Sequence, residues 1–193
     1  AQLCLAKSAE KLLEKYPDRK IITVDTLCAS AGLGLAVYFA YEKKLSGATI
    51  EENAEYLNYV CPKISHWVTV DDLEYLKRGG RVSPTVAFVG KALGIKPIIH
   101  VNDEGKLETV AKARGRKAAL TTLVDKVAET AIEPEKQTMF ISHSACREDA
   151  EFVASEIKAC CGVKEVVISD IGPVIGSHTG VGCIAMCFLG THR

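Results

Sequence analysis

The chain has 193 residues, of which 48% are hydrophobic and 25% are charged, and its formal net charge is zero. This composition is that of an ordinary globular protein, and the length allows one large domain or two small ones. Zero net charge gives no support for a nucleic-acid partner. No apolar run approaches the roughly 18 residues that span a bilayer, and the start does not resemble a signal peptide. We expect a cytoplasmic protein, because the cysteines of the chain fit reduced thiols.

Residues 1–64 predict part of a parallel α/β layer, which we take as one domain. The apolar run Lys20–Asp25 predicts a short buried strand, and a helix over residues 29–44 follows it. Thr26 and Ser30 would then lie at the carboxyl end of this strand. That end of a parallel sheet is where α/β proteins bind their ligands.

Two further helices are expected in this part of the chain. Apolar residues at helical spacing predict one over residues 1–15, which ends before Pro17. The second runs to about Tyr59, and its start carries the pattern of a capping box, with Thr49 as the N-cap and Glu52 three residues later.

Residues 65–193 predict a larger α/β domain with a mixed sheet, because helical patterns alternate with strands and one pair of strands reads as an antiparallel hairpin. The predicted strands cover residues 66–70, 96–101, 106–111, 138–143, 163–169 and 182–189, and the predicted helices cover residues 71–78, 83–93, 116–132 and 147–160.

The eight cysteines form no Cys-x-x-Cys pair, although Cys160 and Cys161 are adjacent. Their spacing resembles no zinc site. A chain of this length buries a core without covalent support, so we expect reduced and mostly buried thiols, with disulfides as the alternative. We predict no metal and no cofactor.

Gly79-Gly80-Arg81 follows directly on the helix predicted over residues 71–78. One interpretation is a helix cap followed by a solvated arginine. The other is that both glycines bring Arg81 close to an anion, since a guanidinium donates two parallel hydrogen bonds to carboxylate or phosphate. Arg114, between a strand and a helix, allows the same two interpretations: a solvated connection, or a second cation facing the cavity of Arg81.

The segment Gly176–Gly180 predicts an exposed, tightly turned loop between core segments. Here His178 lies between two hydroxyl residues, Ser177 and Thr179, with a glycine on each side. These side chains suit a small anionic group. A structural role for His178 and a role as a proton shuttle remain as alternatives, and His143 is the second candidate histidine.

Known catalytic patterns are missing from the sequence. It has no Gly-x-Ser-x-Gly nucleophile elbow, no phosphate-binding P-loop and no Gly-x-Gly-x-x-Gly after a strand. We therefore assign no catalytic residue. The alternative is an enzyme acting on a small anionic metabolite, with His178 as acid–base and Arg81 and Arg114 as anion clamps.

The sequence contains, in this order, the blocks Ile21–Thr26, Gly32–Gly34, Asp72–Ser83, Leu93–Ile98, Arg114 and Ile171–Gly180. Together these blocks closely resemble the DegV family of bacterial fatty-acid-binding proteins. The likeness covers essentially the whole chain, and the Gly-Gly-Arg and Gly-Ser-His-Thr-Gly blocks are its most specific parts.

The resemblance implies two α/β domains with a long-chain fatty acid in the cleft between them. It also implies a carrier without catalysis of its own, which presents the carboxylate to a partner ATP-binding fatty acid kinase. The acyl phosphate made there serves phospholipid synthesis, and such a carrier allows transient membrane contact. By position, Arg81, Arg114 and His178 match the family's polar cluster, and we take Ser177 and Thr179 beside His178 as ligand-binding residues as well. Apolar residues of the slot would include Ile95, Ile98, Val86, Phe88, Val89 and Leu93, although helix spacing equally explains the last four as core.

The chain departs from the family at its start. Members are usually considerably longer, and their hydroxyl-bearing segments that hold the carboxylate precede the position of Ala1. The chain therefore resembles a DegV protein without roughly its first third. If these segments are absent, a scaffolding role without a ligand becomes a third hypothesis.

Overall fold

The structure is a computed structural model that describes residues 2–82 and 94–193, with side chains from residue 7 onward. Its centre is a six-stranded sheet of order β3-β2-β1-β6-β4-β5. Only β4 and β5 run parallel, and the other neighbours are antiparallel. The predicted mixed α/β sheet is thereby confirmed. The strands are β1 Ile64–Thr69, β2 Ile95–Val101, β3 Leu107–Arg114, β4 Thr138–His143, β5 Glu165–Asp170 and β6 Ile184–Leu189.

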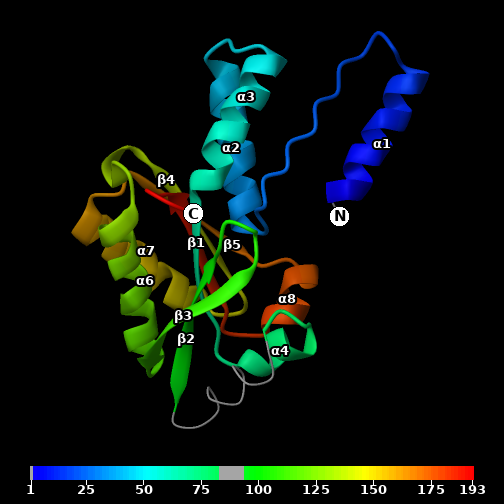
Figure 1. The fold of residues 1–193 in the computed structure, drawn as a ribbon. Coiled ribbons are helices and arrows are strands. Elements are labelled where there is room, and N and C mark those ends of the chain that lie inside the picture. Colours follow the sequence, from blue (N-terminus) through cyan, green and yellow to red (C-terminus); the bar gives the residue numbers. More distant parts are fainter. Residues whose placement is uncertain (1, 83–93) are drawn as a thin grey trace.

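Helices cover both faces of this sheet (Figure 1). On one face lie α6 (Arg116–Thr130) and α7 (Arg147–Cys161), whose buried residues share the largest core cluster with Ile98 and Ile141. On the other face lies α2 (Ala31–Leu45). Strand residues alternate between faces, so the two neighbours Phe140 and Ile141 contribute to different layers.

The second core cluster joins α2 to the sheet. Leu35, which is fully buried, packs with Ile64 of β1 and Cys187 of β6. Since α2 precedes residue 64 in the chain, this packing crosses the predicted domain boundary between residues 64 and 65. That division of the chain stays a prediction.

The remaining helices are shorter or lie at the edges of the sheet. The capping box is confirmed: the Thr49 hydroxyl accepts from the Glu52 amide, and the Glu52 carboxylate accepts from the Thr49 amide. The four remaining α-helices of the described residues are α1 Gln2–Lys15, α3 Ile50–Val60, α4 Leu73–Arg78 and α8 Pro173–Thr179. Short 3₁₀ turns lie at Cys61–Lys63 and Pro134–Lys136.

The predicted strand over residues 20–25 is wrong. This stretch belongs to an extended connection that leads from α1 to α2, outside regular structure (Figure 1). A strand requires a neighbour for its backbone hydrogen bonds, and none of the six described strands pairs with it. Ile21 and Ile22 consequently remain more than a third exposed.

The predicted turned loop at residues 176–180 is also wrong, because most of it belongs to α8. Pro173 occupies the first turn of this helix, and Gly180 ends it with a φ of 72°. Proline at the start and glycine just after the end are the usual signals of a helix. Of the two glycines in this segment, Gly180 marks the end of α8, whereas Gly176 lies within the helix.

The predicted helix over residues 83–93, with the slot residues Val86, Phe88, Val89 and Leu93, lies outside the described residues. Of the other two predicted slot residues, Ile98 is fully buried in the core and Ile95 is half-buried. Within the described ranges, no helix combines the length and apolarity needed to cross a membrane.

Candidate binding site

The two most specific sequence blocks meet where α4 and α8 pack together (Figure 1). Gly79, directly after α4, lies against the imidazole of His178 in the last turn of α8. A Cβ added at Gly79 would come within 2.2 Å of the His178 Nδ1. The Gly-Gly-Arg and Gly-Ser-His-Thr-Gly blocks therefore form one site, although about a hundred residues separate them.

Two further glycines allow this close packing. A Cβ at Gly180 would lie 2.5 Å from the Tyr75 ring, and one at Gly182 would lie 2.4 Å from the Asp71 carboxylate. Both glycines also have positive φ. A side chain at either position would therefore meet both a strained backbone and a steric clash. Gly180 and Gly182 therefore allow the end of α8 to pack closely against α4 and the turn that precedes α4.

Arg81 lies at the exposed rim of this site, where its Nη1 donates to the Gly79 carbonyl at 2.5 Å. Its guanidinium retains further N–H groups for an anion. The neighbouring hydroxyls are engaged within α8: Ser177 donates to the Val174 carbonyl, and Thr179 to the Ile175 carbonyl. Each hydroxyl must rotate away from its helix carbonyl before it can donate to a carboxylate.

The Cys183 thiol, just below α8, is not a nucleophile for this site. Burial raises its pKa to about 12, and a hydrogen bond with Thr179 only partly opposes this effect. The thiol therefore stays protonated at neutral pH. Across the described ranges, no group of three or more His, Cys, Asp and Glu side chains is arranged to hold a metal ion.

Arg114 is placed apart from the other predicted site residues. It is exposed at the end of β3 and lines a hollow of about 470 Å³ with Ile95, Lys112 and Ala113. Among the described residues, Arg114 forms no hydrogen bond or ion pair with Arg81 or His178. The structure thus brings together Arg81, Ser177, His178 and Thr179, and leaves Arg114 at the sheet edge.

The nearby Arg116 has a structural role. Its Nε and Nη2 donate to one Asp149 oxygen at 2.8 and 2.7 Å, and its Nη1 lies 3.5 Å from the Asp71 carboxylate. Lys96 also pairs with Asp71, at 2.8 Å. Since Asp71 lies against Gly182, this ionic network ties the α4–α8 unit to α6 and α7.

Sequence reasoning missed the partners of Ser30. This residue precedes α2, and its hydroxyl lies 3.2 Å from that of the fully buried Ser142 at the end of β4. The expected position of Ser30 at the carboxyl end of a strand over residues 20–25 is wrong, because that strand does not form; Ser30 lies near the end of β4 instead. No local pattern relates two serines that are 112 positions apart.

His143 lies next to Ser142, at the carboxyl end of the parallel pair β4–β5. It is buried, and its Nε2 is 3.6 Å from the Asp170 carboxylate. Neither ring nitrogen forms a hydrogen bond to the described residues. The signal for this pair was available, because the carboxyl ends of neighbouring parallel strands meet at one edge of a sheet.

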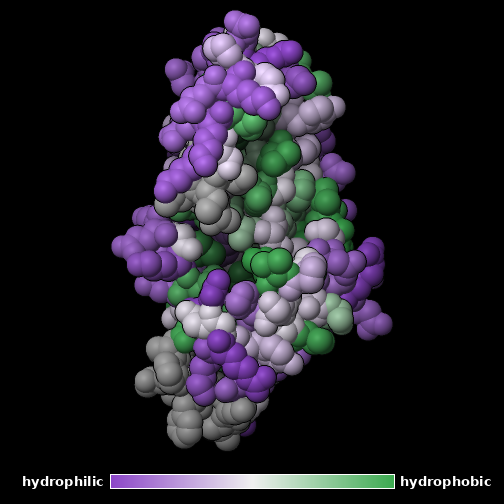
Figure 2. Space-filling view, turned by 90° about the vertical axis from the view of Figure 1, so that its right-hand side faces the viewer, coloured by the Kyte–Doolittle hydropathy of each residue, from purple (hydrophilic) through white to green (hydrophobic). Residues whose placement is uncertain are grey.

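An apolar surface lies on the face of the molecule that carries α8 and the α1 connection. Figure 2 shows hydrophobic side chains gathered down the middle of this face, with hydrophilic ones around them. Exposed large hydrophobic residues include Leu33, Val37 and Tyr41 of α2, Val174 of α8 and Val181 just after α8. The polar α4–α8 site therefore has exposed apolar side chains in its vicinity.

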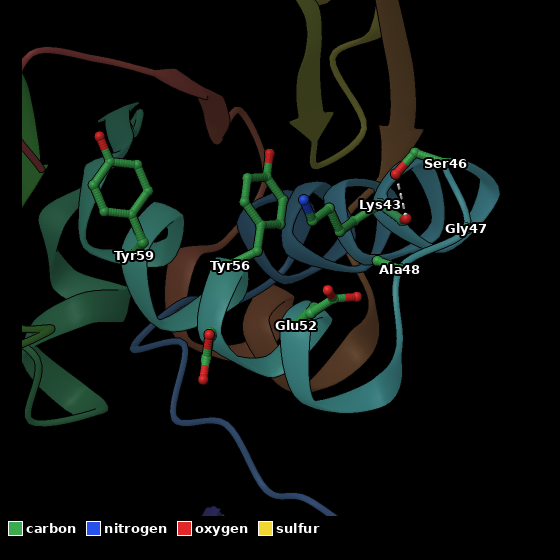
Figure 3. A pocket seen from close by; sticks show the side chains of 8 residues that line it. Lys43, Ser46, Gly47, Ala48, Glu52, Tyr56 and Tyr59 are labelled. Atoms are coloured by element: carbon green, nitrogen blue, oxygen red, sulfur yellow. Dashed lines mark hydrogen bonds between the residues drawn. The ribbon is translucent and has the colours of Figure 1, made fainter.

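A separate polar pocket of about 560 Å³ lies at the tip formed by α2 and α3. Tyr56 and Tyr59 point to the same side, and Lys43 reaches toward Tyr56 (Figure 3). The Lys43 ammonium lies 5.4 Å from the Tyr56 ring centroid, and that of Lys63 lies 3.6 Å from the Tyr59 ring. Lysines of the chain itself already occupy these ring faces, and the pocket contains no predicted site residue.

Comparison with known proteins decides the family. The sequence profile described as "uncharacterised protein, DegV family" matches residues 5–191. The chain belongs to the DegV family. A DegV domain-containing protein of Clostridium perfringens is 48% identical over 181 residues, which are 94% of this chain and 62% of that protein. The chain thus spans about three fifths of the length of this relative.

Solved DegV structures share the fold. A fatty-acid-binding DegV family protein from Streptococcus agalactiae has a TM-score of 0.76 and 31% identity over 94% of this chain and 64% of its own. The fatty acid kinase B3 protein of Streptococcus pneumoniae, solved with linoleic acid, has a TM-score of 0.86 and 20% identity. That match covers 95% of this chain and 65% of the other.

Proposed function

We propose that this protein binds a long-chain fatty acid, with the acyl chain on the apolar surface and the carboxylate at the α4–α8 site. The contact of Gly79 with His178 carries the proposal, because it assembles a polar site from the two blocks that resemble the family. The solved DegV proteins described as fatty-acid-binding or loaded with linoleic acid support the ligand class.

The energetics of a fatty acid fit these two regions. Each methylene removed from water contributes about 0.8 kcal/mol, so a long acyl chain supplies most of the binding free energy. The carboxylate must be hydrogen-bonded wherever water is excluded. Arg81, His178 and the hydroxyls of Ser177 and Thr179 are the groups that would receive it, with Arg114 as a more distant cation.

We further propose that the bound acid is presented to a partner kinase, which transfers phosphate to the carboxylate. The likeness to the kinase B3 protein supports this role. Arg81 at the exposed rim is suited to a phosphate, since its guanidinium is always charged and donates in pairs. In this role the protein is a carrier, and the chemistry belongs to the kinase.

The test is mass spectrometry of the purified protein, followed by lipid extraction. A carrier should lose a fatty acid of defined mass on denaturation, and the extract should identify it. The alternative, an enzyme for a small anionic metabolite, predicts no such acid. Arg81→Ala and His178→Ala should weaken retention, while Arg147→Ala is a matched control, because Arg147 is exposed on α7 and pairs with Glu151.

A further inference from the structure

The last two residues of α7 form a pair of adjacent thiols. The Sγ atoms of Cys160 and Cys161 lie 3.0 Å apart, and Gly162 ends the helix with a φ of 65°. Cys160 is exposed, whereas Cys161 is half-buried and packs against the main core. One thiol is therefore held by packing, and the other faces solvent beside it.

The other described cysteines are placed differently. Cys61, Cys183 and Cys187 are buried. Cys28 and Cys146 are half-buried, and their thiols donate to the backbone carbonyls of Thr26 and Cys183. Among the cysteines that the structure describes, the pair at the end of α7 is the one that offers two neighbouring thiols at the surface.

We propose that Cys160 and Cys161 form a dithiol site for a monosubstituted trivalent arsenical. Sulfur ligands select soft centres. A pyramidal arsenic atom holds two sulfurs at about a right angle, which keeps them close together, as they are here. A two-coordinate soft cation places its two sulfurs on opposite sides of the metal, which does not fit two sulfurs that lie close together. Tetrahedral zinc needs four ligands, and the described residues hold no such cluster.

A disulfide is the less favourable product for this pair. Adjacent Cα atoms are 3.80 Å apart across a trans peptide, whereas disulfides usually join Cα atoms about 4.4–6.8 Å apart. Closing the bond would strain the last turn of α7. Bridging by a larger atom spans the two sulfurs without that strain, so the dithiol is suited to chelation.

The binding step is a condensation. An arsenoxide, R–As=O, exchanges its oxygen for two As–S bonds, and both thiol protons leave with that oxygen as one water. Arsenic stays trivalent, so no oxidant or reductant is required. Exposed Cys160 attacks first. Cys161, whose Sγ lies 3.0 Å from that of Cys160, closes the ring in a step made intramolecular by the first bond.

The dithiol lies at the opposite end of β5 from the candidate fatty-acid site. α7 ends just before β5 and α8 begins just after it (Figure 1). A strand of six residues spans about 20 Å. Chelation at α7 and fatty-acid binding at α8 can therefore be measured independently, and failure of one leaves the other standing.

The experiment treats the folded, reduced protein with phenylarsine oxide, washes it with a monothiol and measures its intact mass. We expect one arsenical per chain that survives the monothiol and is removed by 2,3-dimercaptopropanol. Cys160→Ser and Cys161→Ser should each abolish the stable adduct, whereas Cys4→Ser, Cys28→Ser and Cys61→Ser should retain it. Circular dichroism checks that each variant is folded.

Three results would overturn the proposal. The first is an adduct that persists in both Cys160→Ser and Cys161→Ser. The second is a folded wild-type protein that keeps no adduct after the monothiol wash. The third is a wild-type mass lower by two hydrogens after reduction and exposure to air, mapped to a Cys160–Cys161 disulfide, because a stable disulfide contradicts the strain argument.

Discussion

The imidazole of His178 occupies the space that a side chain at residue 79 would need: a Cβ at Gly79 would lie 2.2 Å from the His178 Nδ1. Gly79 has an ordinary φ of −75°, so its backbone accepts any residue. The requirement for glycine here is therefore steric, and it comes from the histidine.

Gly79→Ala should displace His178 and separate α4 from α8. Overpacking of this kind costs about 1–3 kcal/mol, and fatty-acid affinity should fall with it. Urea unfolding and the NMR signals of the His178 ring report the two effects. Gly172→Ala is the matched control, because nothing lies within 4 Å of its Cβ position. Equal behaviour of both variants would contradict the steric argument.

Arg81→Ala and Arg114→Ala should reduce kinase-coupled phosphorylation of bound fatty acid more than they reduce binding itself. The acyl chain supplies most of the binding free energy, whereas the guanidinium groups act on the carboxylate or its phosphate. Titration with a fluorescent fatty acid and an acyl-phosphate assay separate the two. Large and equal losses in both assays would mean that the arginines mainly hold the ligand.

Stability should fall as the pH drops from about 6.5 toward 4 because of His66. Burial lowers its folded-state pKa from 6.5 to about 4, and its Nδ1 donates to the Ile64 carbonyl. Below pH 6.5 His66 binds a proton in the unfolded chain but stays neutral in the folded protein until about pH 4, so protonation favours unfolding. The stabilisation present above pH 6.5 reaches about 3 kcal/mol and is lost by pH 4.

Urea unfolding of the wild type and His66→Gln at pH 7.5, 5.5 and 4.5 measures this effect. The variant should lose less stability between the highest and lowest pH, whatever its absolute stability. Identical pH slopes in the two proteins would show that His66 titrates normally. The nearby His100 also has a pKa lowered by burial, and His100→Gln measures its separate share.

Thr49→Ala should destabilise the protein by about 1 kcal/mol, the usual cost of removing an N-cap hydroxyl. The Glu52 amide loses its acceptor, and the start of α3 becomes less well capped. Chemical denaturation checks the size of the effect. Thr122→Ala is a suitable comparison, because that hydroxyl bonds to a carbonyl within α6 and its removal leaves no helix terminus uncapped.

Local patterns predicted what local interactions determine. The capping box of Thr49 and Glu52 needs only residues three apart, and most strands and helices follow from the spacing of apolar residues. The prediction of a strand at residues 20–25 was wrong because a strand needs a neighbouring strand to pair with, and the local apolar pattern does not show whether one exists. α8 was missed because its proline and glycines resemble those of a turn, although Pro173 and Gly180 also fit a helix start and end.

The candidate site was predicted in its members but not in its arrangement. The Gly-Gly-Arg and Gly-Ser-His-Thr-Gly blocks were both singled out, and the structure adds that one glycine of the first lies under the histidine of the second. The contact of Ser30 with Ser142 depends on α2 crossing the sheet. Such contacts arise from tertiary packing, which no spacing along the chain encodes.

The position of β6 constrains how this sheet can form. β6 follows the other five described strands along the chain, yet it lies inside the sheet, between β1 and β4. Until Ile184–Leu189 leave the ribosome, β1–β3 and β4–β5 have no strand to join them. The two halves must wait as separate units with open edges, and a chain that stops short of residue 184 would leave both exposed to aggregation.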